Sequence, residues 1–174
     1  MKSQDIAVVG ILLAVGAIVR YLSLVIPGPI VSNLVIAFYC LAVILVVPKF
    51  TEVIGIGIVA GIVCALLSHS IFPPANLVSE PIGAVVCLLT FKALRSKLSV
   101  SPAIATLLGT LASGTSFVIV AMLMVAPAIL SKFTTMGAFA GAVIPIVIGT
   151  AIANAVIAQI LYPPASKVLA RGRA

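Results

Sequence analysis

Few residues in this sequence could carry chemistry, and several of them share one polar stretch between apolar runs. Residues 68–81 hold His69, the only histidine, together with Asn76 and Glu80, which is one of three acidic residues in the chain. One histidine cannot make a metal site. There is also no Ser-His-Asp set of plausible geometry, no pair of carboxylates within one helix and no H-E-x-x-H motif. The sequence therefore predicts binding of a small molecule, without enzymatic activity, metal or cofactor.

Arg20 is the strongest single signal, because it lies inside a long apolar run and is followed by Tyr21. An arginine at the membrane centre costs roughly 2.5–3.5 kcal/mol on insertion scales, so another group should compensate it. Its guanidinium could bind an anionic group, such as a substrate carboxylate, in a bidentate geometry. It could instead reach the outer headgroups or pair with Glu80. Arg20 is thus a candidate site residue with two structural alternatives.

Glu80 has a structural explanation of its own. It precedes Pro81, which is favourable in a first helical turn, and Ser79 could be the N-cap, so we predict a helix that begins near Pro81. A carboxylate at a helix N-terminus is stabilised by the helix dipole and needs no ligand. This interpretation is favoured. The alternative is that Glu80 receives a substrate ammonium or the Arg20 guanidinium.

Other polar and aromatic residues are weaker candidates, because such side chains often join or anchor helices. Substrate-binding candidates are Tyr39, His69, Phe72, Asn76 and Asn154, with Asn33 and Phe38 as further possible cavity residues. Residues 72–76 could form a lid. Asn154 would contribute only if the cavity reaches the middle of its helix. Ser113, Thr115, Ser116 and Gln159 are expected to hold helices together.

The elements that position these residues follow from composition. The chain has 174 residues, of which 63% are hydrophobic and 7% charged, and its mean hydropathy is +1.41, whereas soluble domains are about 25% charged. We predict an all-α integral membrane protein forming one domain, a single bundle of six transmembrane helices near residues 6–26, 30–47, 53–71, 81–97, 101–125 and 136–161. No nucleotide-binding motif is present. Active transport would therefore need an ion gradient or a partner.

The basic residues predict the orientation. With the N-terminus inside, the cytoplasmic ends would carry Lys2, Lys49, Lys92, Arg95, Lys97, Lys167, Arg171 and Arg173, and the outer connections only Lys132. Both termini would then be cytoplasmic in a plasma-membrane protein. Residues 27–29, 72–80 and 126–135 would meet on the outer face. Because this rule accounts for the net charge of +7, no nucleic-acid partner is expected.

The first predicted helix also has a smooth face. Ala7, Gly10, Ala14 and Ala17 recur at spacings of three and four, which lets another helix approach closely. The face could pack within the bundle, which is the commoner use, or dock a partner subunit.

Several short motifs together resemble a known family. They are the Ala/Gly-rich residues 10–17, the Pro48-Lys49 turn, and residues 57–62, 72–81, 108–114 and 162–163. With these motifs the chain resembles the substrate-binding S components of energy-coupling factor transporters, and among them the bacterial tryptophan transporter family. The resemblance implies a six-helix membrane protein that binds a vitamin or amino acid near the outer face. It also implies a transmembrane coupling subunit and two ATP-binding subunits as partners, docked on the face of Gly10, Ala14 and Ala17.

The leading hypothesis is therefore capture of tryptophan or a similar small zwitterion. Arg20 would face the substrate carboxylate, and residues 72–80 would close over the ligand. One alternative keeps the S-component architecture with a vitamin or vitamin precursor as ligand. Another is a stand-alone secondary transporter or structural membrane subunit. Against ion coupling, Arg20 is the one clear intramembrane ionisable group, and proton relays usually need several.

Overall fold

The structure is a computed structural model that describes residues 1–23 and 33–172, and its regular elements in these ranges are all helical. They are α1 (Ser3–Ser23), α2 (Val35–Val46), α3 (Phe50–Leu66), the 3-10 turn η1 (Pro73–Ala75), α4 (Asn76–Leu94), α5 (Ser101–Met124), α6 (Ala126–Phe133) and α7 (Met136–Gly172). The all-α prediction is confirmed for the described residues. The predicted break at residues 27–29 and the adjoining helix ends lie outside them.

Within residues 1–23 and 33–172, four stretches are long and apolar enough to cross a membrane: α1, the continuous η1–α4 segment, α5 and α7. Helices α2 and α3 are apolar but shorter, with 12 and 17 residues. A helix needs about 20 apolar residues to span the hydrocarbon core. The helices therefore match those of a multi-pass membrane protein. That the chain crosses the membrane six times remains a prediction.

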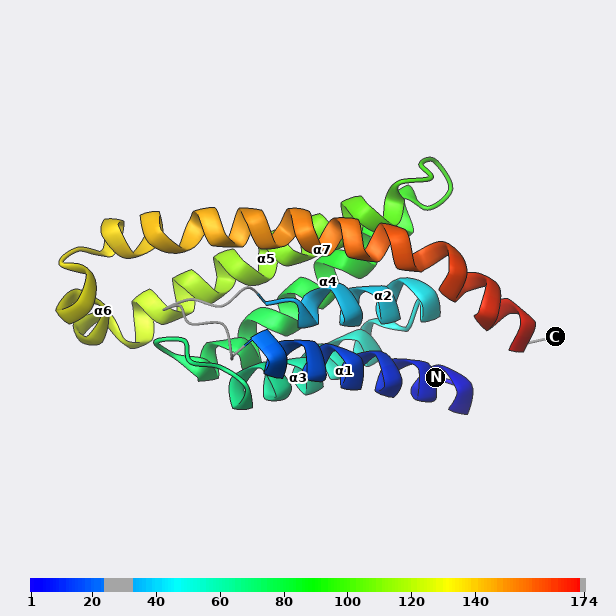
Figure 1. The fold of residues 1–174 in the computed structure, drawn as a ribbon, viewed down its shortest axis with the longest axis horizontal. Coiled ribbons are helices and arrows are strands. Elements are labelled where there is room, and N and C mark those ends of the chain that lie inside the picture. The colour runs from blue at the N-terminus through cyan, green and yellow to red at the C-terminus, as the bar shows by residue number, and fades with distance from the viewer. Residues whose placement is uncertain (24–32, 173–174) are drawn as a thin grey trace.

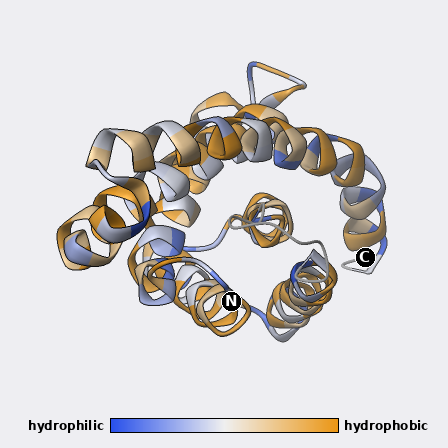
Figure 2. Ribbon diagram, turned by 60° about the vertical axis from the view of Figure 1, so that its left-hand side comes forward, coloured by the Kyte–Doolittle hydropathy of each residue, from blue (hydrophilic) through white to orange (hydrophobic). Residues whose placement is uncertain are grey.

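The long helices lie side by side, and α6 forms a short cap at one end (Figure 1). Helix α2 is the central element, because it contacts α1, α3, α4, α5 and α7 and is buried without interruption from Val35 to Ile44. A helix that is apolar on every side belongs inside a bundle. Viewed from near one end, the other helices surround a central one, with hydrophobic residues on outward faces as well (Figure 2).

Glycines bring α4 very close to its neighbours. A Cβ added to Gly83 would lie 2.7 Å from the Tyr39 hydroxyl oxygen and 2.8 Å from the Gly109 carbonyl oxygen of α5. On the opposite side, a Cβ on Gly57 of α3 would lie 2.4 Å from the Cα of Pro81. Small residues at such contacts allow backbones to pack directly in a membrane. Helix α4 is therefore held firmly between α3 and α5.

The prediction for the start of α4 is wrong. The helix begins at Asn76, so Glu80 lies more than one turn inside it and Ser79 is not its N-cap. The chain is already wound by η1, which leads directly into α4. Pro81 consequently sits inside the helix, where it removes one hydrogen bond to a preceding carbonyl, a loss that membrane helices tolerate.

Three other boundaries differ from the sequence prediction. Helix α3 ends at Leu66, so His69 lies in the connection to η1 and not at a helix end. Residues 126–133 form α6, where only a connection was expected. Helix α7 continues through Pro163 and Pro164 to Gly172, so Lys167 and Arg171 lie on a helix instead of a tail.

The basic ends predicted to be cytoplasmic lie together. Both ends of the described chain, the α2–α3 turn and the α4–α5 connection are at one end of the bundle, and the α3–η1 connection and α6 are at the other (Figure 1). At the first end, the N-terminal ammonium of Met1 pairs with the Glu52 carboxylate of α3. For the described connections, the sequence prediction of which of them share an end therefore agrees with the arrangement of the helices.

Candidate functional site

A cavity lies between the helices toward the α3–η1 end of the bundle. Residues on α1, α4, α5 and α7, before and on α2, and in the α3–η1 connection line it. Its empty volume is about 690 Å³, part of which is continuous with the outside. This space includes open solvent at the mouth, so the lining residues, and not the volume, indicate which kind of ligand the cavity suits.

The cavity has two chemically different walls. Its polar wall includes Arg20 of α1, residues 68–70 of the connection, and Asn76, Ser79 and Glu80 of α4. Its apolar wall comes from α5 and α7 and includes Phe117, Val143, Ile146 and Val147. A ligand that suits both walls has a charged, hydrogen-bonding end and a large apolar end.

Glu80 is the most constrained polar residue of the site, with a side chain that is only 1% exposed. Its Oε1 accepts a hydrogen bond from Asn33 Nδ2 at 2.7 Å. Its Oε2 accepts from the Tyr39 hydroxyl at 2.8 Å and from the Ser113 hydroxyl at 3.0 Å. These donors lie before α2, on α2 and on α5, so three parts of the chain fix one carboxylate. Donors of this kind stabilise a buried carboxylate and set its direction.

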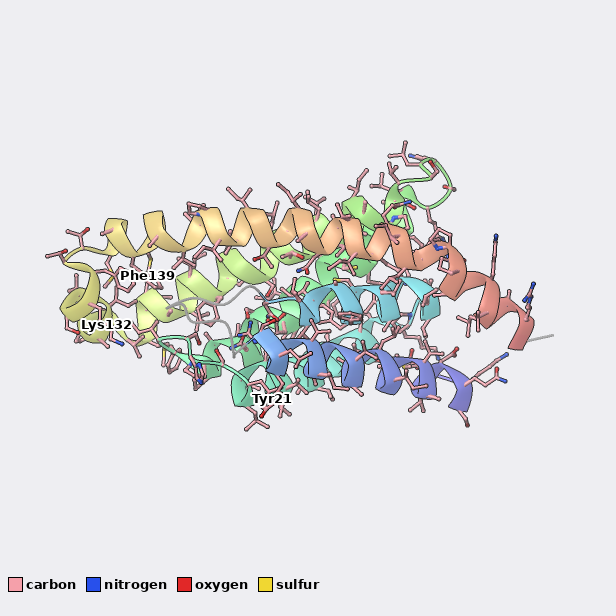
Figure 3. The ribbon with its side chains drawn as sticks, in the orientation of Figure 1. Tyr21, Lys132 and Phe139 are labelled. Atoms are coloured by element: carbon pink, nitrogen blue, oxygen red, sulfur yellow. The ribbon has the colours of Figure 1, made fainter. Side chains whose placement is uncertain are left out.

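Arg20 faces the cavity and is 5% exposed. Its Nε donates to the Leu67 carbonyl oxygen at 2.9 Å, at the C-terminal end of α3, where helix carbonyls carry partial negative charge. The next residue, Tyr21, points away from the bundle and is 62% exposed (Figure 3). Glu80 lines the same cavity as Arg20. The site thus presents a cation and an anion to one cavity.

Asn154 lies behind this site and does not line the cavity. Its Nδ2 donates to the Asn33 carbonyl oxygen at 3.1 Å and to Thr110 Oγ1 at 3.3 Å. Asn33 in turn donates to Glu80. Asn154 of α7 therefore supports the residue that holds the carboxylate, and it joins α7 to α5 and to the start of α2.

The other candidates from the sequence have different positions. His69 and Asn76 line the cavity, and Asn76 Nδ2 also donates to the Pro73 carbonyl oxygen at 2.7 Å, which fixes η1. Tyr39 is fully buried behind Glu80. Phe72 is not on the cavity wall and packs against a second apolar cluster that contains Phe139. Phe139 points from α7 toward α6, near Lys132 (Figure 3).

Sequence reasoning undervalued several residues of this site. Ser113 joins helices as expected, but its partner is Glu80 and it also lines the cavity. Thr115 and Ser116 instead donate to carbonyl oxygens of their own helix. Ser79 and Thr150 line the cavity and were not predicted to. A usable signal was the spacing of Asn76, Ser79, Glu80 and Gly83, which puts them on one face of a helix.

The small-residue face of α1 does not pack against other described helices. Gly10 and Ala14 are exposed, and a Cβ added to Gly10 would meet no atom within 4 Å. Ala17 is half-buried. Helix α1 contacts α2 through Gly16, where an added Cβ would lie 3.3 Å from Phe38 Cβ. The face of Gly10, Ala14 and Ala17 is thus largely uncovered in the described part of the chain.

The fold is that of a multi-pass helical membrane protein, with an internal cavity that has a charged and an apolar wall. Comparison with known proteins makes this more specific. Residues 2–170 match the family described as tryptophan transporter TrpP, and the chain belongs to that family of transporters. It is 26% identical to a probable tryptophan transport protein of Bacillus subtilis (strain 168), over 98% of this chain and 95% of that protein. No solved structure matches. The predicted membership of the tryptophan transporter family is confirmed.

Proposed function

We propose that this protein captures tryptophan, or a similar small zwitterion, in the cavity at the α3–η1 end of the bundle. The observation that carries the proposal is the pairing of a charged wall, with Arg20 and Glu80, and an apolar wall, with Phe117 and Val147, around one space. Tryptophan has the same two parts, a zwitterionic backbone and a large aromatic ring. The family match and the named relative support the same ligand.

The charges suggest how the ligand is oriented. A guanidinium binds a carboxylate in a bidentate geometry, so the ligand carboxylate lies toward Arg20. The ammonium then lies toward Glu80, and the ring lies against α5 and α7. Charged groups removed from water need partners of opposite charge, which this wall supplies. The ring gains by leaving water for the apolar wall, at about 25 cal/mol per Å² of buried apolar surface.

Delivery of the captured ligand requires a source of energy. We propose the S-component arrangement, in which a transmembrane coupling subunit and two ATP-binding subunits supply it. The absence of a nucleotide-binding motif and the uncovered face of Gly10, Ala14 and Ala17 support a partner. In the same proposal, the chain crosses the membrane six times and both of its termini are cytoplasmic. The basic end then meets the cytoplasm and the cavity lies toward the outside.

A second candidate is transport by this protein alone, driven by an ion gradient. The observation in its favour is Glu80, which is a second buried ionisable group beside Arg20, since such groups mark ion pathways in membranes. Gradient-driven tryptophan uptake by liposomes that contain this protein alone would favour it. Co-purification with ATP-binding subunits would favour the first candidate. If the purified protein retained a vitamin, the ligand would be that vitamin and not tryptophan.

Binding can be measured through the ligand itself, because the protein contains no tryptophan residue. L-Tryptophan, excited where tyrosine absorbs little, should change its fluorescence when titrated with detergent-purified protein. Absence of saturable binding would overturn the proposed function.

Arg20→Ala should weaken L-tryptophan binding by about 10- to 100-fold, because it removes a charge-assisted contact. Lys132→Ala, which removes an exposed cation on α6, is the matched control and should bind normally. Unchanged affinity in Arg20→Ala would remove Arg20 from the site.

A further inference from the structure

Ser79 has an unusual hydroxyl. Its side chain is fully buried, it lines the cavity, and its Oγ has no hydrogen-bond partner among the described residues. Buried side-chain oxygens are nearly always hydrogen-bonded. Helical serines and threonines usually donate to a carbonyl of the preceding turn, as Thr110 and Ser116 do here. The Ser79 hydroxyl is therefore available to a bound molecule.

The carboxylate of Glu80, the next residue, can accept a further hydrogen bond. Ser79 and Glu80 lie on the face of α4 that lines the cavity, and Asn76 precedes Ser79 by three residues on the same face. Among the described residues, Glu80 Oε1 accepts one hydrogen bond, from Asn33, whereas Oε2 accepts two. A carboxylate oxygen can accept two. Oε1 of Glu80 and Oγ of Ser79 can thus both accept hydrogen bonds from a ligand.

We infer that Ser79 and Glu80 form a subsite for a primary ammonium group, with Ser79 as a further binding residue. This inference rests on the proposed function and specifies its ligand class. A primary ammonium carries three donors and a positive charge, which suit two acceptors beside a buried anion. A ligand carboxylate at the same place would be repelled by Glu80 and is drawn to Arg20. The subsite selects amino acids and amines over indole compounds that lack the amino group.

Three indole ligands separate the possibilities. L-Tryptophan has both charged groups, tryptamine has only the ammonium, and indole-3-propionate has only the carboxylate. Each can be titrated by its own fluorescence, since the protein has no tryptophan. Ser79→Ala should weaken L-tryptophan and tryptamine binding by about 10- to 100-fold, the usual effect of losing a hydrogen bond to a charged group. It should leave indole-3-propionate binding unchanged. Ser79→Cys, which keeps the size but has a weakly hydrogen-bonding thiol, should behave like Ser79→Ala.

The matched control is Ser116→Ala, because that hydroxyl donates to a carbonyl of its own helix and does not line the cavity. It should bind all three ligands as the unmodified protein does. Unchanged tryptamine and L-tryptophan binding in both Ser79 variants would overturn the ammonium subsite. So would an equal loss of indole-3-propionate binding, which would assign the hydroxyl to the carboxylate. If the unmodified protein binds no L-tryptophan, the proposed function fails, and that result is distinct from either of these.

Discussion

Glu80 holds helices together and, in the proposed function, also faces the ligand, and two substitutions separate these roles. In Glu80→Ala, the Asn33 amide and the Tyr39 hydroxyl lose their acceptor. Ser113 can turn to a carbonyl of its own helix, as other hydroxyls of α5 do. Tyr39 is fully buried, whereas Asn33 is half-buried on the cavity wall and keeps a contact with Cys64 Sγ at 3.5 Å. An unsatisfied buried polar group costs about 1–3 kcal/mol, so we expect the free energy of unfolding to fall by about this amount. For a chain of this size, each kcal/mol lowers the melting temperature by about 2–4 °C.

Glu80→Gln should behave differently. The glutamine oxygen can accept from Asn33 Nδ2, and its NH₂ group can donate to the hydroxyl oxygens of Tyr39 and Ser113 after these rotate. The side-chain volume and the contact with Asn33 are kept while the negative charge is lost, but the hydroxyl hydrogens of Tyr39 and Ser113 must turn to other acceptors. We expect a melting temperature closer to that of the unmodified protein than to that of Glu80→Ala. L-Tryptophan binding should weaken by about 10- to 100-fold because the ammonium loses its anion.

Both variants can be assayed in detergent by thermal unfolding and by ligand fluorescence. Glu52→Gln is the control, because Glu52 lies at the opposite end and pairs with the N-terminus of Met1, away from the cavity. It should leave L-tryptophan affinity unchanged. If Glu80→Gln bound L-tryptophan with normal affinity, Glu80 would have only a structural role. If it unfolded as early as Glu80→Ala, the charge itself would be needed for the fold, and the hydrogen-bond reasoning would be wrong.

Two further predictions concern packing and orientation. Gly83→Ala should destabilise the protein by about 1–3 kcal/mol, since its Cβ would lie 2.8 Å from the Gly109 carbonyl oxygen; thermal unfolding should show no such loss for Gly141→Ala, whose Cβ meets nothing within 4 Å. In intact cells, a membrane-impermeant maleimide should label Ser131→Cys, on exposed α6, and should label Ser99→Cys only after permeabilisation. The three native cysteines are buried and should stay unlabelled. The reverse labelling pattern would refute the proposed orientation.

Hydropathy predicted where the helices lie, but local rules misplaced the start of α4. Proline is favourable in a first helical turn, so Ser79 and Glu80 were interpreted as cap residues before Pro81. The alternative, a proline inside the helix, loses only one backbone hydrogen bond. Here α4 begins at Asn76, directly after η1 and five residues earlier than predicted, and Gly57 lets α3 approach the Pro81 backbone directly. The position at which α4 begins therefore depends on a contact between two helices. The residues next to Pro81 in the sequence do not show this contact.

The sequence predicted best those residues of the candidate site whose types are rare in apolar helices. Arg20 and Glu80 stand out because charges are scarce in apolar runs, and both line the cavity. Ser113 looks like any other helical hydroxyl, and its contact with Glu80 spans 33 residues of sequence. Ser79 shares a helix face with Asn76 and Glu80, which the sequence could indicate. That its Oγ has no hydrogen-bond partner among the described residues depends on the surrounding atoms, and the sequence could not indicate this.

Burial of two opposite charges in one cavity bears on how the site discriminates among ligands. Taking charges out of water is costly, and apolar residues in their place often give a more stable protein. The carboxylate of Glu80 is nevertheless fixed by donors before α2, on α2 and on α5, so its orientation is set before any ligand arrives. A zwitterion offers Glu80 and Arg20 partners of the right sign, whereas a neutral indole compound leaves both with fewer partners. In the proposed function, the apolar wall thus contributes affinity for the ring, and the charged wall selects the amino acid over other compounds that carry the same ring.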